Sequence, residues 1–260
     1  GWGTLQMGDE DGAEDIMNYG GENLMGATGG FDGDFDDVLL RDTCCVTVAR
    51  APSYPTIAGD TSDHTKVSYF SPRFSGFQVG ASITPTTGMD GDEFKADGGG
   101  FENHIGLGAN YDNSFGDLRI RASAVYSGAS STSTGTEDIS AWSAGGIVGF
   151  GPFSVGANYT DNGDSGSDAG SSDESSYWDV AASFETGPIY LSAGYYASVY
   201  DYVGGAQDEF TNIALTADYT VAPGLGVYAD ITMIDDKEDT GFSPVDQSAT
   251  TLILGANISF

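Results

Sequence analysis

Four aspartates lie close together in a long stretch, residues 8–63, that is rich in Gly and Asp: Asp32, Asp34, Asp36 and Asp37. Carboxylates at this density suit two kinds of chemistry. They can ligate a hard cation such as Ca²⁺, or they can hold a negative potential that acts on charged solutes. Either use requires the rest of the chain to place the stretch where an ion or a solute can reach it.

Further acidic groups in Gly-containing stretches have spacings that could chelate calcium: Asp90 and Asp92, and Asp161, Asp164 and Asp168. None completes the EF-hand pattern, which needs a bidentate Glu at its twelfth position. The same carboxylates would also serve as solvated loop residues. We therefore expect no required cofactor, and we keep Ca²⁺ binding at these acidic loops as a hypothesis.

Basic residues that could oppose the acids are few. Lys66, Arg119 and Arg121 alternate with apolar residues, and His104 lies in a similar pattern. The two arginines could face the acidic stretch, or they could pair with Asp117 or Asp230 and simply stabilise the wall. A hydrolase would need a nucleophile beside a base, but no Gly-x-Ser-x-Gly setting accompanies either histidine. We therefore expect no enzyme activity.

The elements that carry these residues follow one pattern. After residue 63 the chain is a series of short segments in which apolar and polar residues alternate, as in Phe77, Val79, Ala81 and Ile83. A period of two is the signature of a strand with one apolar and one polar face. No Lys, Arg, Asp or Glu falls on the apolar faces, and the other faces are rich in Gly, Ser and Asn. Such a sheet is apolar toward lipid and polar toward a lumen.

The connections between these segments also sort by length. Short turns at 71–76, 112–115, 151–152, 186–188 and 222–224 alternate with long stretches at 85–101, 127–138, 161–175, 200–208 and 235–248. An up-and-down meander places all short turns at one rim and all long loops at the other. Aromatic residues such as Phe150 and Phe153 gather beside the short turns, as in an interfacial girdle. The sequence predicts an all-β transmembrane barrel with about twelve strands, each near the length a tilted membrane strand needs.

Composition narrows the class further. The net charge is −31, with only 8 Lys and Arg, so nucleic acid is excluded as a partner. No apolar run is long enough for a membrane helix. The chain opens on Gly1–Trp2, and we expect it to be a processed or truncated product.

The run Val67-Ser-Tyr-Phe-Ser-Pro-Arg-Phe-Ser-Gly-Phe-Gln-Val-Gly-Ala-Ser82, the opening Gly-Trp-Gly-Thr-Leu-Gln-Met-Gly-Asp and the terminal strand ending in Phe260 resemble the general diffusion porins of Gram-negative bacteria. That family has sixteen strands and a third long loop that folds inward after the fifth. The resemblance implies that these strands correspond to strands 5–16. It also implies a homotrimer in the outer membrane, in contact with outer-membrane lipids and lipopolysaccharide.

On this interpretation residues 1–260 form one β-barrel domain, and residues 8–63 fold into its lumen as a constriction loop. The constriction would combine Asp32, Asp34, Asp36 and Asp37 with Lys66, His104, Arg119 and Arg121. The expected function is passive diffusion of small hydrophilic solutes and ions, with a preference for cations because of the negative charge. A barrel with a plugged lumen used for adhesion or anchoring, or an outer-membrane hydrolase, is the alternative.

Overall fold

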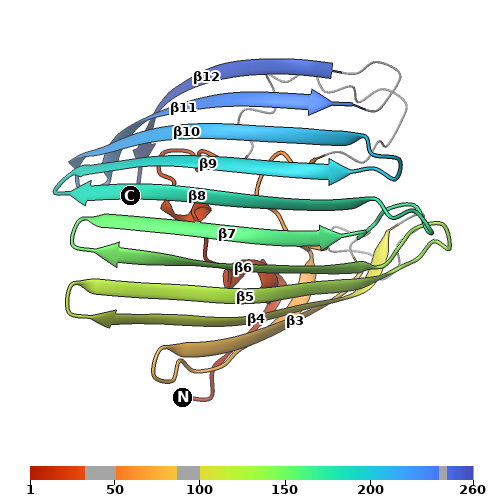
Figure 1. Ribbon diagram of the computed structural model, residues 1–260. Helices are drawn as coiled ribbons and strands as arrows, with labels where there is room; N and C mark the ends of the chain where they lie inside the picture. The colour runs from red at the N-terminus through yellow and green to blue at the C-terminus, as the bar shows by residue number, and fades with distance from the viewer. Residues whose placement is uncertain (33–50, 87–99, 240–244, 260) are drawn as a thin grey trace.

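The described residues of the chain form twelve strands, which build a single curved antiparallel sheet (Figure 1). The computed structural model describes residues 1–32, 51–86, 100–239 and 245–259. The strands are β1 (Thr4–Asp9), β2 (Thr65–Phe70), β3 (Phe77–Thr86), β4 (Phe101–Phe115), β5 (Leu118–Ser131), β6 (Ile139–Phe150), β7 (Phe153–Gly163), β8 (Glu174–Thr186), β9 (Ile189–Asp201), β10 (Gln207–Ala222), β11 (Leu225–Glu238) and β12 (Val245–Ile258). Among the described residues they pair only in chain order, so β1 and β12 are the two edges.

The predicted alternation of faces is present in the structure. Leu252, Leu254 and Ile258 are 62%, 71% and 65% exposed on the convex side of the sheet. On the concave side, Arg119 and Arg121 share the face of Ser123, which contacts residue 19. The first strand, whose faces the sequence did not assign, exposes Leu5 and Met7. A sheet with an apolar outer face and a polar inner face is the arrangement that lipid on one side and water on the other select.

Several strands run further than the sequence predicted. The stretches 127–138, 161–175, 200–208 and 235–248 were expected to be loops, but β5, β7, β9, β11 and β12 extend into them. Backbone pairing needs no apolar side chains, so the ladder continues where the apolar band ends. The short turn expected at 112–115 is likewise displaced, because β4 reaches Phe115. The tight turns use glycines with positive φ, such as Gly151 (54°) and Gly187 (55°).

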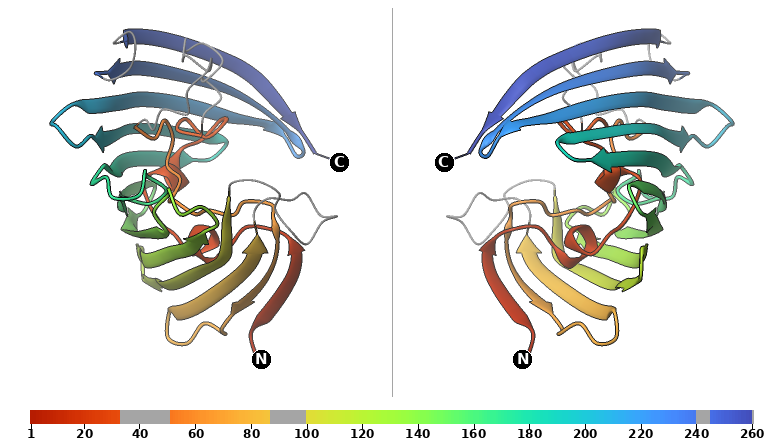
Figure 2. Two further views of the ribbon diagram at one scale, coloured as in Figure 1. Left: turned by 90° about the vertical axis from the view of Figure 1, so that its right-hand side faces the viewer. Right: turned by 90° about the vertical axis from the view of Figure 1, so that its left-hand side faces the viewer.

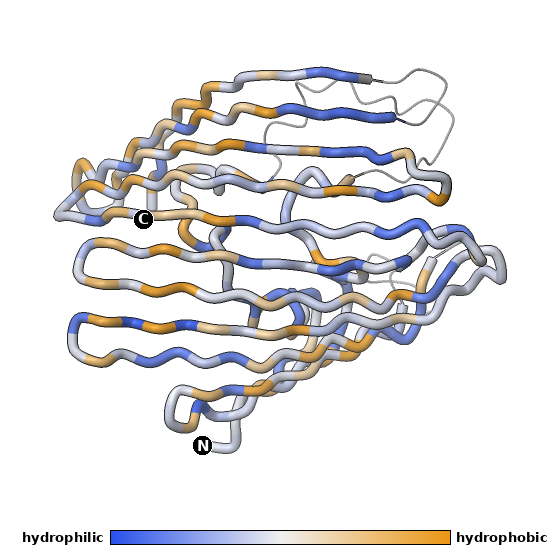
Figure 3. The backbone as a smooth tube through the Cα atoms, viewed as in Figure 1, coloured by the Kyte–Doolittle hydropathy of each residue, from blue (hydrophilic) through white to orange (hydrophobic). Residues whose placement is uncertain are grey.

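Two aromatic bands mark the outer face. One lies beside the short turns, as predicted, and includes Phe153 and Phe184, whose ring centroids are 5.0 Å apart. The other was not predicted and lies toward the long connections, where Trp178 packs on Tyr195 at 5.1 Å. Aromatic girdles flank the hydrocarbon region of outer-membrane barrels. Figure 3 shows for β10, β11 and β12 that hydrophilic residues gather toward the ends that carry the long connections.

The described parts of the long acidic stretch lie on the concave side of the sheet (Figure 2). We name residues 10–64, described at 10–32 and 51–64, the inner segment. It contains a short helix α1 (Ala13–Ile16) and a 3₁₀ turn η1 (Glu22–Leu24). No helix among the described residues is long and apolar enough to cross a membrane.

Candidate functional site

The first half of the inner segment follows the concave wall from β3 to β11. Each strand on the way presents a small or acidic polar side chain to it. The N–H of Ala13 donates to Ser82 Oγ at 3.1 Å, and the N–H of Tyr19 donates to Ser123 Oγ at 2.8 Å. Further along, the N–H of Gly26 donates to both Ser192 Oγ and Thr216 Oγ1, each at 3.1 Å. The polar inner face predicted from the sequence therefore serves largely to dock the chain's own backbone.

Wall carboxylates that the sequence analysis did not assign to docking hold the far end of this run. Asp179 accepts from the N–H of Glu22 at 3.2 Å. Asp218 accepts from the N–H of Ala27 through Oδ1 at 3.1 Å and Oδ2 at 3.0 Å. Asp230 accepts from Thr28 Oγ1 at 3.0 Å. Their positions on the polar faces of β8, β10 and β11 were the signal that could have identified them.

Glycines allow the close approach of backbone to wall. A Cβ on Gly108 would lie 2.7 Å from Cβ of Met17, and one on Gly156 would lie 2.9 Å from the carbonyl oxygen of Gly20. Real Cβ atoms do not approach other atoms this closely, so a larger residue would push the inner segment off the wall. The Gly-rich inner face of the strands is therefore a packing requirement as well as a polar surface.

The second half of the inner segment returns along the wall nearer the long connections. Tyr196 donates its hydroxyl to the carbonyl oxygens of Pro52 (2.9 Å) and Tyr54 (3.0 Å). The N–H of Ala58 donates to Asn162 Oδ1 at 2.8 Å. Both runs are thus fixed to the wall by hydrogen bonds.

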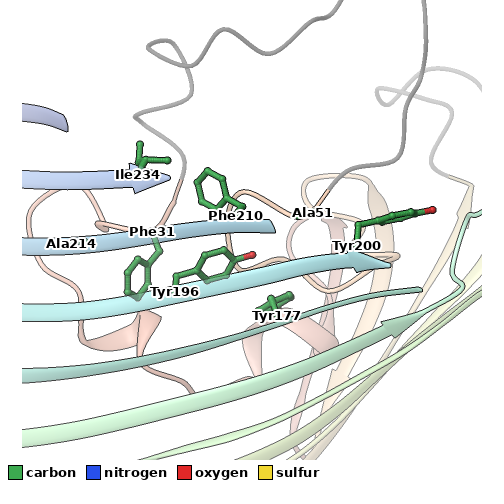
Figure 4. Packing of buried hydrophobic residues seen from close by; sticks show 8 residues of the cluster. All are labelled: Phe31, Ala51, Tyr177, Tyr196, Tyr200, Phe210, Ala214 and Ile234. Carbon is green, nitrogen blue, oxygen red and sulfur yellow. The ribbon is translucent and has the colours of Figure 1, made fainter. Parts of the chain in front are cut away.

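An apolar cluster beneath the two runs adds to this attachment (Figure 4). Phe31 and Ala51 from the inner segment pack against Tyr196, Phe210 and other concave residues of β8 to β11. The ring centroids of Phe31 and Tyr196 are 6.0 Å apart. The sequence predicted a concave face that is polar throughout. The structure differs, because apolar wall residues are buried where the inner segment covers them.

Lys66, which the sequence analysis placed in the constriction, does not line an open passage in the structure. It is 2% exposed, and its Nζ donates to the carbonyl oxygens of Glu10 and Ser62. These two carbonyls lie at opposite ends of the inner segment. Lys66 therefore joins the two stems of the segment.

His104 is also covered. It is 4% exposed and faces Thr84 across β3 and β4. Its ring lies edge-on to Phe101, with centroids 6.4 Å apart. The structure thus separates Lys66 and His104, which are buried, from the two predicted arginines.

The arginines lie below the first run, toward the short turns. Arg119 binds Asp112 with two hydrogen bonds, Nε to Oδ1 at 3.0 Å and Nη2 to Oδ2 at 2.7 Å. Its partner is therefore a residue of the adjacent strand β4, and not Asp117 or Asp230. Arg121 stacks instead on the ring of Tyr19, with Cζ 5.4 Å from the ring centroid.

Asp32 is the one predicted constriction acid within the described residues, and its side chain is exposed at the end of the first run. Asp34, Asp36 and Asp37 lie outside the described residues. Two other acids of the inner segment have altered titration. Burial raises the pKa of Glu14, whose carboxylate accepts from Ser82 Oγ at 2.9 Å. Burial, followed by the neighbouring charges of Asp179 and Asp15, raises the pKa of Glu22 to about 8.

A cavity of about 660 Å³ opens between the first run and the short turns. Asn23 and Leu24 cover it from the inner segment, and Tyr190 lines it from β9 while donating its hydroxyl to Leu24 O at 2.7 Å. Arg119 and Arg121 line it from β5. We name this cavity the short-turn chamber.

The described members of the predicted calcium ligands are not brought together. Among the described residues no group of three or more His, Cys, Asp or Glu side chains could hold a metal ion. Asp161 instead accepts from the N–H of Gly163 at 2.9 Å, while Asp164 and Asp168 are exposed. Asp90 and Asp92 lie outside the described residues.

Solved structures with the same fold are outer-membrane proteins. A loop-deletion mutant of OmpT of Vibrio cholerae is similar over 99% of this chain and 76% of its own, with a TM-score of 0.62 and 18% identity. A porin structure is similar over 100% and 78%, with a TM-score of 0.59 and 20% identity. An anion-selective porin from Comamonas acidovorans is similar over 75% and 59%, with a TM-score of 0.54 and 18% identity.

These identities are low, so the structural matches show the fold alone. No curated protein matches the chain. The sequence model of the Gram-negative porins, however, matches residues 1–239. The chain therefore belongs to the Gram-negative porin family, whose members are channels of the outer membrane and not enzymes.

Proposed function

We propose that this porin forms a water-filled passage for passive diffusion of small hydrophilic solutes and ions, that it prefers cations, and that the inner segment narrows the passage. The support for the narrowing is the docking of the inner segment on the concave wall from Ser82 of β3 to Asp230 of β11. A segment fixed on that side occupies part of the cross-section that solutes would use.

The preference for cations follows from the charge of the chain. The sequence carries 39 acidic and 8 basic side chains, and a mouth lined by acids concentrates cations within about a Debye length, near 8 Å at physiological salt. The anion selectivity in the name of the Comamonas porin belongs to that protein.

Reversal potentials test this proposal. The protein is reconstituted in a planar bilayer with a KCl gradient, and the sign of the zero-current voltage reports which ion carries more current. We expect K⁺ to dominate, and more strongly at low ionic strength because screening is weaker there. A current carried mainly by chloride would overturn the cation preference.

The same recordings distinguish an open passage from a plugged barrel that serves for adhesion or anchoring. We expect stepwise ohmic currents, whereas a plugged lumen gives none. The proposed constriction combines Asp32, Asp34, Asp36 and Asp37 of the inner segment with Arg119 and Arg121 of β5. Of its described members Asp32 is exposed, whereas Lys66 and His104 are buried and would support the wall from within.

We also propose a homotrimer in contact with outer-membrane lipids and lipopolysaccharide. The support is a structure of OmpT of Vibrio cholerae in a trimer form, which is similar over 98% of this chain with a TM-score of 0.62. Light scattering on the detergent-solubilised protein should give three times the 26.9 kDa chain mass after subtraction of detergent. A mass of one chain would contradict the trimer.

Calcium at the acidic loops is the least supported of these proposals, because its support is the residue types alone. Calorimetric titration with millimolar CaCl₂ tests it, with MgCl₂ as the control, since Ca²⁺ accepts irregular oxygen sites more readily than Mg²⁺ does. Absence of heat specific to Ca²⁺ would remove the hypothesis.

A further inference from the structure

The two ends of the barrel differ in charge. Outside the second aromatic band, the long-connection ends of the strands expose Glu174, Asp201, Glu209, Asp235 and Asp246. The one exposed Lys or Arg among the described residues there, Lys237, already lies 3.8 Å from Glu209 and 3.9 Å from Asp235. Toward the short turns, by contrast, three basic residues, Arg73, Arg119 and Arg121, lie near Asp112.

Distance and screening keep these two ends independent. Ten residues separate Arg121 from Ser131 at the far end of β5, which is about 30 Å at about 3.3 Å per residue. The Debye length at physiological salt is only about 8 Å. The acidic outer end therefore does not set the potential in the short-turn chamber.

Within the chamber, one guanidinium retains its capacity to bind an anion. Asp112 faces Arg121 directly across β4 and β5, but both of its oxygens are taken by Arg119. Nε of Arg121 is buried and has no hydrogen-bond partner, and among the described residues no ion pair to Arg121 is present. The trio of Asp112, Arg119 and Arg121 thus carries a net positive charge.

Stacking on Tyr19 fixes the orientation of this guanidinium. Its Cζ lies over the ring, 5.4 Å from the centroid, and a guanidinium that contacts a ring through its face keeps its N–H donors for partners in its own plane. Such a preorganised fork matches the two oxygens of a carboxylate. Ser154, Ser183 and Asn23 line the same chamber and offer hydroxyl and amide groups to the rest of a polar solute.

We propose that the short-turn chamber is a binding site for hydroxylated carboxylate solutes, with the carboxylate held by Arg121. This inference rests on the proposed diffusion function, because the site lies on the path that solutes would follow. Asp117 and Glu185 also line the chamber, so the site favours one carboxylate beside Arg121 over a polyanion. The channel would then attract cations at its outer mouth and retain carboxylates at its inner end.

Blocking of single-channel current by gluconate tests the site in the intact reconstituted protein. Glucose, of similar size and without charge, is the control solute. We expect gluconate to interrupt the KCl current in discrete events and to associate faster when added on the short-turn side than on the long-loop side. Glucose should give no comparable events.

Variants assign the effect to the guanidinium. Arg121→Gln should weaken gluconate binding about tenfold or more, because a charged hydrogen-bonding partner is lost, and Arg121→Lys should restore part of it. Arg73→Gln is the matched control, since Arg73 lies at the same end but binds Gly76 O and Gln78 Oε1 outside the chamber. It should change gluconate binding less than twofold.

Equal effects of Arg121→Gln and Arg73→Gln would overturn the proposal, as would the absence of gluconate events in the unaltered channel. Inorganic phosphate added in place of gluconate tests the ligand class. Block by phosphate without block by gluconate would show the carboxylate assignment to be wrong. Absence of ohmic steps in the unaltered protein would instead mark failure of the proposed diffusion function.

Discussion

The backbone N–H of Glu22 donates to Oδ1 of Asp179, 3.2 Å away, and so brings two acidic residues together against β8. Asp179 is 1% exposed, and its Oδ2 has no hydrogen-bond partner. Burial and the charge of Asp179 raise the pKa of Glu22 to about 8. At neutral pH the Glu22 carboxyl is therefore mostly protonated, so no second negative charge lies beside Asp179.

This relationship predicts that alkaline conditions weaken the docking of the inner segment. Because the pKa of folded Glu22 is above its ordinary value of 4.5, the folded state binds more protons. The contribution of protonated Glu22 to the stability of the folded state is fully present below about pH 4.5 and is lost as the pH rises through about 8. The apparent melting temperature of the unaltered protein should fall between pH 6 and pH 9, and Glu22→Gln should reduce that fall. An identical fall in the variant would refute the assignment to Glu22.

Lys66 should act on the position of the inner segment more than on ion selectivity. Lys66→Met removes the hydrogen bonds to Glu10 O and Ser62 O, and a charged hydrogen bond contributes about 1.5–3 kcal/mol. We expect lower thermal stability and noisier open-channel current, with little change in reversal potential. The control is Lys237→Met, which removes an exposed charge at the outer end. A shift in selectivity with quiet current would show that Lys66 lines the pore instead.

Two variants of Asp218 should distinguish its role as a hydrogen-bond acceptor for the inner segment from the effect of its negative charge. Asp218→Asn keeps an oxygen that can accept from the N–H of Ala27, whereas Asp218→Ala leaves that donor without its partner. The alanine variant should be less stable by about 1–3 kcal/mol, and its amides near Ala27 should exchange hydrogen faster. The asparagine variant should keep its exchange protection. Equal exchange in the two variants would indicate that Asp218 does not hold the segment.

The lipid boundary can be tested with adjacent residues of β7. Val155 is 54% exposed on the outer face between the aromatic bands, and Ser154 lines the short-turn chamber. Val155→Arg should destabilise the barrel by about 2 kcal/mol or more, since a basic residue near the bilayer midplane costs about 2–4 kcal/mol. Ser154→Arg should have a much smaller effect on unfolding in lipid vesicles. The reverse order would invert the two faces of the sheet.

The architecture of the wall could be predicted from the sequence because the alternation of apolar and polar residues is local. Spacing alone predicts an outer face that carries Phe77, Val79, Ala81 and Ile83. The order of short and long connections then implies a meander, since antiparallel neighbours need only short turns. The sequence did not predict the ends of β5 and β11, because beyond the apolar band both faces of the strands are polar and the alternation disappears, while the backbone still pairs.

The hydrogen-bond and ion-pair partners of charged residues inside the lumen could not be predicted from the sequence. Whether Lys66 faces water or the carbonyls of Glu10 and Ser62, and whether Arg119 or Arg121 takes Asp112, depends on contacts between residues far apart in the chain. A residue's face follows from its neighbours along one strand, so the sequence by itself determined the barrel wall and its polarity. Which charges remain free depends on where the inner segment docks, and only the tertiary structure decided that.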